Sequence, residues 1–158
     1  MKKTYVFAAL LTFLTFELGA QEAPPAIDTK LYDIINDVSA DRIEADIRTL
    51  AGFGTRNTFS DTVSETRGIG AARRWIKAEF EKISNECAGC LEVFYQKDLV
   101  TTEMGRRIPK DAYIVNVVAV IRGTDYPDSY VLMSGDIDSR ASNTMNYEID
   151  APGANDNA

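Results

Sequence analysis

Residues 130–140 have the sequence YVLMSGDIDSR, and residues 151–158 have the sequence APGANDNA. The first stretch is an apolar run that ends in Asp136 and Asp138, and the second is a Pro/Gly loop that carries Asp156. In open α/β sheets, ligands bind beyond the carboxyl ends of the strands, where such acids would collect. We therefore expect residues 130–135 to form a buried strand, with the three acids at its carboxyl end.

The rest of the chain predicts helices followed by further strands. Apolar residues recur at helical spacing over 31–38, 40–51 and 68–83, and Gly52 and Gly54 end the second helix. Residues 55–67 are polar and without period, which is typical of a surface loop. Residues 91–100 alternate like a strand, and the continuous β-branched run 112–121 is typical of a strand buried on both faces. This order predicts an α/β fold whose sheet looks unfinished at Ala158.

Composition narrows the function. The chain has 158 residues and a net charge of −7, which suits one domain and argues against nucleic acid or an anionic membrane surface as a partner. It has no histidine, so neither a Ser-His-Asp triad nor a Cys-His pair can form within it. Any metal site made by these residues must use oxygen or sulfur ligands.

The first twenty residues predict a signal peptide. Lys2 and Lys3 precede an apolar stretch over 5–16, and Ala20 offers a cleavage point before Gln21. An uncleaved anchor is the alternative. We expect an exported, periplasmic or extracellular protein with no stable membrane insertion after cleavage. Residues 21–38 would be a linker and first helical segment, and residues 39–158 the domain.

Cys87 and Cys90 form a C-x-x-C pair. Behind an exported leader, a local disulfide is the favoured interpretation. A redox motif is the alternative. A zinc ribbon would need a second cysteine pair, which the sequence lacks.

The three acids admit two interpretations. Asp136 and Asp138 are two residues apart, so on a continuous strand they point the same way, and the loop could bring Asp156 to them. Acids gathered at a buried strand end imply a cation between them. Alternatively, they are exposed loop residues that cap turns.

Five motifs together resemble the M28 family of zinc metallopeptidases. They are LAGFGTR (50–56), AARRWI (71–76), NVVA (116–119), Gly-x-x-Asp-Ser (135–139) and Ala-Pro-Gly-Ala-x-Asp-Asn (151–157). The chain is similar to the N-terminal portion of secreted aminopeptidases of the leucyl-aminopeptidase and aminopeptidase Y kind, over residues 39–158. The resemblance implies a mixed central sheet flanked by helices (the zinc-dependent exopeptidase fold) and two zinc ions at the strand ends. By position, Asp156 would bridge both ions, Asp138 would orient the first ligand, and Asp136 occupies a histidine position.

Aspartate at position 136 departs from the family pattern. A histidine ligand leaves a ring N–H for a neighbouring carboxylate, whereas Asp136 has none to offer to Asp138. Three hypotheses stay open: Asp136 binds metal with a shifted preference, the site holds one ion or holds metal poorly, or the site is inactive and the domain serves for binding.

The implied function is a metal-dependent aminopeptidase that hydrolyses N-terminal bonds of peptides or proteins, with zinc polarising the carbonyl and activating water. The family's general base and remaining ligands follow the position of Asp156, so we expect an incomplete chain that is inactive alone. The alternatives are a non-catalytic, M28-like exported binding domain and a glutaminyl cyclase-like enzyme on the same fold.

Overall fold

The computed structural model describes residues 28–156, so the predicted signal peptide lies outside the described residues. These residues belong to two units, one up to Val38 and one from Ser39 onward, and each is described by itself. The first unit contains α1 (Thr29–Asn36), whose N-terminus is capped by the Asp28 carboxylate. None of the helices in the described part of the chain has the length and apolar character needed to cross a bilayer.

In the second unit, α2 (Ala40–Gly52) begins at the predicted residue 40 and ends one residue beyond the predicted 51. Ser39 Oγ accepts a hydrogen bond from Arg42 N (3.2 Å), and Asp41 lies in the first turn, where a negative charge is favourable. Beyond the helix, Gly54 adopts a φ of +72°, a left-handed conformation that glycine tolerates best.

The longest helix, α3 (Gly68–Glu86), supplies most of the apolar core. Ile69, Ala71 and Ala72 are at most 2% exposed. Just beyond the helix, Cys87 and Cys90 form a disulfide, with their Cα atoms 5.5 Å apart.

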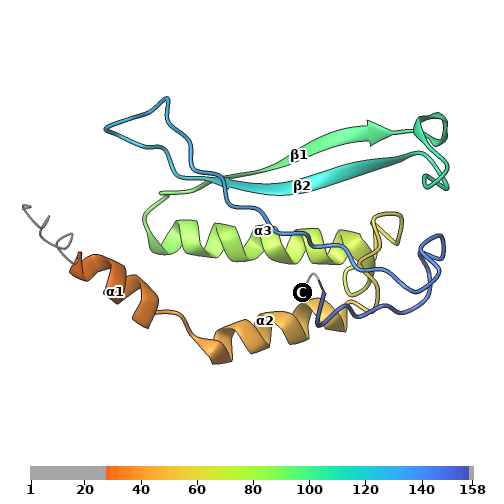
Figure 1. Ribbon diagram of the computed structural model, residues 1–158, viewed down its shortest axis with the longest axis horizontal. Helices are drawn as coiled ribbons and strands as arrows, with labels where there is room; N and C mark the ends of the chain where they lie inside the picture. The colour runs from red at the N-terminus through yellow and green to blue at the C-terminus, as the bar shows by residue number, and fades with distance from the viewer. Residues whose placement is uncertain (1–27, 157–158) are drawn as a thin grey trace, which may run out of the picture. The chain divides into compact units, whose positions relative to one another are not determined.

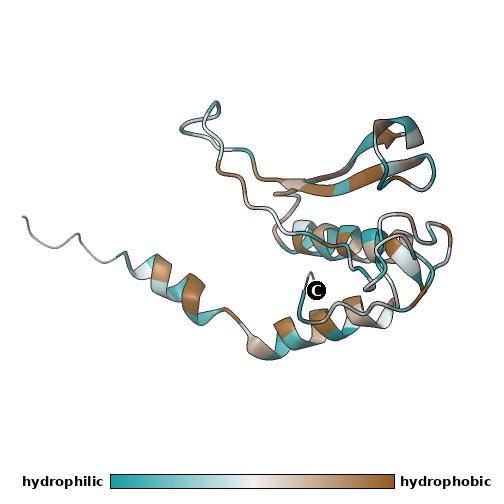
Figure 2. Cartoon of the chain, turned by 45° about the vertical axis from the view of Figure 1, so that its right-hand side comes forward, coloured by the Kyte–Doolittle hydropathy of each residue, from teal (hydrophilic) through white to brown (hydrophobic). Residues whose placement is uncertain are grey.

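The sheet of the described chain is the antiparallel pair β1 (Glu92–Val100) and β2 (Ala112–Val120), joined by a connection that contains η1 (Thr102–Met104). α3 runs alongside this hairpin and contacts both strands (Figure 1). The Tyr95 hydroxyl donates to the Arg73 carbonyl (3.4 Å), so the face that carries Tyr95 is the one packed on α3. β2 is largely hydrophobic along its length (Figure 2).

Two strand predictions are wrong. β2 is not buried on both faces: Ile114 is 41% exposed, because α3 covers only one face of the hairpin. Residues 130–135 are not a strand, and Val131 is 95% exposed. A strand needs a hydrogen-bonding neighbour, and in the described chain these residues pair with neither β1 nor β2.

The described residues therefore form a small α/β domain with a two-stranded antiparallel sheet. The α/β class is confirmed. The mixed central sheet flanked by helices, which the resemblance implies, stays a prediction.

The predicted surface loop after α2 is buried where it begins. Thr55, Arg56, Asn57 and Ser60 are between 0% and 6% exposed. Their polar groups bond to one another and to α3: Ser60 Oγ donates to Asn57 O (2.6 Å) and accepts from Ile69 N (2.9 Å). A polar sequence can be buried when its donors and acceptors are paired in this way, which composition alone does not reveal.

Candidate metal-binding segments

Arg56 is the centre of the region that holds the predicted site. Its side chain is fully buried and donates to backbone carbonyls of α2 and of two later segments. The acceptors are Ile137 O (from Nε, 2.9 Å), Leu50 O and Pro152 O (from Nη1, 2.8 and 2.7 Å) and Gly153 O (from Nη2, 3.4 Å). One guanidinium thus joins three parts of the chain that lie far apart in sequence.

The first later segment carries Asp138. Arg56 N donates to Ser139 Oγ (2.9 Å), and Ser139 is 2% exposed. Together with the bond to Ile137, this contact holds both neighbours of Asp138. Burial lowers the pKa of the Arg56 guanidinium, and the negative charge of Asp138 partly opposes that shift. Asp138 is therefore close enough to Arg56 for an electrostatic attraction.

The second later segment returns to the same place. Ala151 N donates to Gly54 O (2.8 Å), and Ala151 forms a parallel bridge with Thr55. A Cβ on Gly153 would lie 2.7 Å from Ser139 Cβ, so these two residues are in direct contact. The predicted Gly-x-x-Asp-Ser and Ala-Pro-Gly motifs are therefore side by side.

The acids themselves are less closely grouped than their segments. Asp136 and Asp156 are exposed, and Asp138 is half-buried. Within residues 28–156, no three His, Cys, Asp or Glu side chains are close enough to hold one metal ion. Carboxylates suit zinc, but catalytic zinc sites use three protein ligands, so the described residues do not by themselves make such a site. The roles of Asp136, Asp138 and Asp156 stay predictions.

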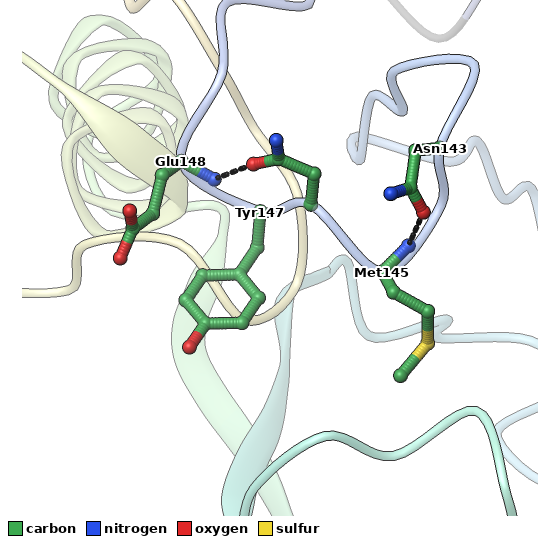
Figure 3. Close-up of a pocket in the computed structure, with 5 residues that line it drawn as sticks. Asn143, Met145, Tyr147 and Glu148 are labelled. Carbon is green, nitrogen blue, oxygen red and sulfur yellow. Dashed lines mark hydrogen bonds between the residues drawn. The ribbon is translucent and has the colours of Figure 1, made fainter.

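Residues 140–150 form the loop between the two segments. The Asn143 side chain accepts from Met145 N (3.1 Å) and the Asn146 side chain from Glu148 N (3.2 Å), which folds the loop around a shallow hollow (Figure 3). Arg67 ties the loop to the start of α3 by an ion pair with Asp150 (2.5 Å). This loop is therefore anchored although it contains neither helix nor strand.

Sequence reasoning missed Arg56 and Ser139. Both stand inside motifs that the sequence singles out, Arg56 at the end of LAGFGTR and Ser139 after Asp138. The available signal was a lone arginine two residues after Gly54, in the turn that follows the helix. Its burial depends on contacts more than eighty residues away in sequence, to Ile137 and Ser139.

Comparison with known proteins finds several relatives, and the three described below are each named a probable zinc metalloprotease. The chain is 39% identical over 156 residues to one from Pyrenophora teres f. teres and 42% identical over 141 residues to one from Leptosphaeria maculans. It is 42% identical over 131 residues to one from Pyricularia oryzae.

The matches cover 99%, 89% and 83% of this chain but only 32%, 32% and 26% of the relatives. The chain thus spans about a third of their length. No family model matches the chain, and no solved structure matches it.

Proposed function

We propose that these residues belong to a metal-dependent aminopeptidase of the M28 kind, which removes N-terminal residues from peptides or proteins. The observation that carries the proposal is the junction at Arg56. It sets the Asp138 segment against the loop that leads to Asp156, the two segments to which the family resemblance assigns metal ligands. The names of the relatives support metal-dependent proteolysis.

Within this proposal, Asp156 would be the ligand shared by two zinc ions, and Asp136 would be a ligand in a histidine position. Asp138 would occupy the place of the family's orienting acid, although Asp136 offers it no N–H. Zinc would polarise the scissile carbonyl and activate water. The chain's own contribution is to hold two carboxylate-bearing segments together, and the remaining ligands and the general base would come from other residues. The predicted signal peptide supports an exported location.

The test is hydrolysis of leucyl-p-nitroanilide by the complete product of the reading frame that encodes these residues. We expect turnover that a chelator abolishes and added zinc restores. Cleavage of blocked peptides at internal bonds instead would contradict the aminopeptidase assignment, and no metal-dependent cleavage would contradict the proposal as a whole.

A non-catalytic exported binding domain is the second candidate, favoured by one observation. Asp136 stands where the family pattern has histidine, and the sequence contains no histidine. Asp136→His separates the two candidates when zinc content is measured on the complete product. A gain in bound zinc and activity would favour an enzyme whose site Asp136 impairs, whereas a zinc-poor parent that gains neither would favour the non-catalytic binding domain.

A further inference from the structure

Burying the charged side chain of Arg56 in the core costs desolvation free energy. Among the described residues, the two largest fully buried side chains are Arg56 and the apolar Ile69. Burying a charge costs free energy that an apolar side chain of similar volume would not, so filling space does not account for an arginine here. What arginine adds is a rigid, planar fork of donors that fixes the direction of several acceptors at once.

The acceptors of that fork have a common property. They belong to the end of α2 and to residues 137 and 152–153, and between residues 121 and 156 the described chain has no helix and no strand (Figure 1). Backbone geometry there cannot be maintained by a helix or a ladder of strand hydrogen bonds. Apart from the backbone bond from Ala151 N to Gly54 O, side-chain contacts must do so, and the Arg56 side chain that makes several of them is fully buried.

We propose that Arg56 is a positioning residue, which fixes the backbone on both sides of Asp138 against the loop that leads to Asp156. This proposal rests on the proposed function for its meaning, because those two acids matter only if they serve a metal site. The Arg56 guanidinium also binds Leu50 O, so it fixes the positions of both acid-bearing segments relative to the C-terminal end of α2.

Two details support a precise rather than a general role. Arg56 brackets Asp138, with its side chain on the carbonyl of Ile137 and its backbone N–H on the hydroxyl of Ser139. On the other side, a glycine at position 153 allows the loop to approach to contact distance of both Ser139 and the Arg56 guanidinium. The two segments are therefore held at one separation.

Arg74 provides a matched control. It also donates to loop carbonyls, those of Thr62, Val63 and Ser64, but these belong to the connection before α3 and not to the acid-bearing segments. Arg56→Lys and Arg74→Lys each keep a positive charge and remove the fork.

The experiment uses the full chain with its Cys87–Cys90 disulfide intact and a nitroxide label on the exposed position of an Ala154→Cys substitution. Paramagnetic broadening of the Ser139 amide in ¹H–¹⁵N spectra then reports the separation of the two segments. We expect strong broadening in the parent chain, loss of it in Arg56→Lys, and retention in Arg74→Lys. The amide shifts of β1 and β2 should be unchanged in both variants, which separates positioning from general destabilisation.

Broadening retained in Arg56→Lys would overturn the proposal, and so would its loss together with shifts throughout β1 and β2. If Arg56→Lys does not fold, Ser139→Ala replaces it, because it removes only the acceptor of the Arg56 backbone N–H. Reduced broadening at residues 137–139 is then expected, and unchanged broadening would overturn the proposal. The experiment measures no peptidase activity, so its outcome does not depend on whether the proposed function is correct.

Discussion

At Gly153 the backbone has a φ of +58°, and a Cβ would approach Ser139 Cβ to 2.7 Å and Asp156 O to 2.8 Å. Both facts require glycine. We expect Gly153→Ala to lower the free energy of unfolding by about 2 kcal/mol, the usual range for a non-glycine residue held in a left-handed conformation. Urea unfolding measures the change.

Gly52 is the control for this substitution. It lies at the end of α2, and a Cβ there would meet no atom within 4 Å. Gly52→Ala should be neutral or slightly stabilising, since alanine favours a helix more than glycine does. Equal losses in the two variants would contradict the role of Gly153.

Asp61 predicts a pH dependence of stability. Its carboxylate accepts hydrogen bonds from the backbone N–H groups of Ser64 and Val63, which lower its pKa below the ordinary 3.8. Because the folded-state pKa is the lower one, the stabilisation is fully present above the unfolded pKa and is lost as pH falls through the folded value. We expect Asp61→Ala to lower stability at neutral pH and to make unfolding less sensitive to acid below that ordinary value.

Urea unfolding of the parent chain and of Asp61→Ala, each at pH 7 and pH 3, measures this loss of stability in acid. Asp125→Ala is a suitable control, because the Asp125 carboxylate accepts only from its neighbour Thr124. An acid dependence that is identical with and without Asp61 would show that its hydrogen bonds do not stabilise the folded state.

At the scale of elements, local sequence and observed structure agree where stabilising contacts are local. The bounds of α2 depend on Ser39 and Gly54, which act through their own turns, and both are visible in the sequence. The strands β1 and β2 also lie where periodicity places them, because the short connection between them allows adjacent antiparallel pairing.

Residues 130–135 show where that agreement ends. Their composition favours a strand, but strand formation needs a second strand at its edge, and the described residues provide none to this segment. We expect the amides of Val131, Leu132 and Met133 to exchange with solvent at close to intrinsic rates, while the β1-paired amides of β2 are protected. Hydrogen exchange followed by NMR measures both sets in one sample.

Protection of the 131–133 amides comparable with that of β2 would contradict this expectation. It would show that the segment pairs with a strand in solution. Dilution of the sample would then distinguish pairing within one chain, which is independent of concentration, from pairing between copies.

At the scale of the whole molecule, the described residues do not provide the ligand set that the proposed chemistry needs. It has no histidine, and the residues from 28 to 156 contain no cluster of three potential metal-binding side chains. We expect the purified 158-residue chain to show no chelator-sensitive hydrolysis of leucyl-p-nitroanilide. Turnover by this chain that a chelator abolishes and zinc restores would contradict that expectation; an authentic zinc aminopeptidase in the same buffer is the positive control.

For the candidate site, the motifs were visible in the sequence but their connection was not. The Gly-x-x-Asp-Ser and Ala-Pro-Gly motifs could be singled out by residue type, and the helix-end motif before them contains Arg56. That an arginine from one motif holds the other two together could not be predicted, since its hydrogen bonds go to backbone carbonyls, which every residue has.

By itself, the sequence determined the α/β class, the places where α2 and α3 begin and the positions of the strands β1 and β2, because each depends on caps, turns and periodicity acting over a few residues. Only the tertiary structure decided that residues 55–60 are buried and that residues 130–135 lie exposed outside the sheet. It also placed the Asp138 segment against the loop leading to Asp156. These outcomes depend on whether a polar group or a strand edge finds a partner elsewhere in the chain, and that is a property of the folded molecule.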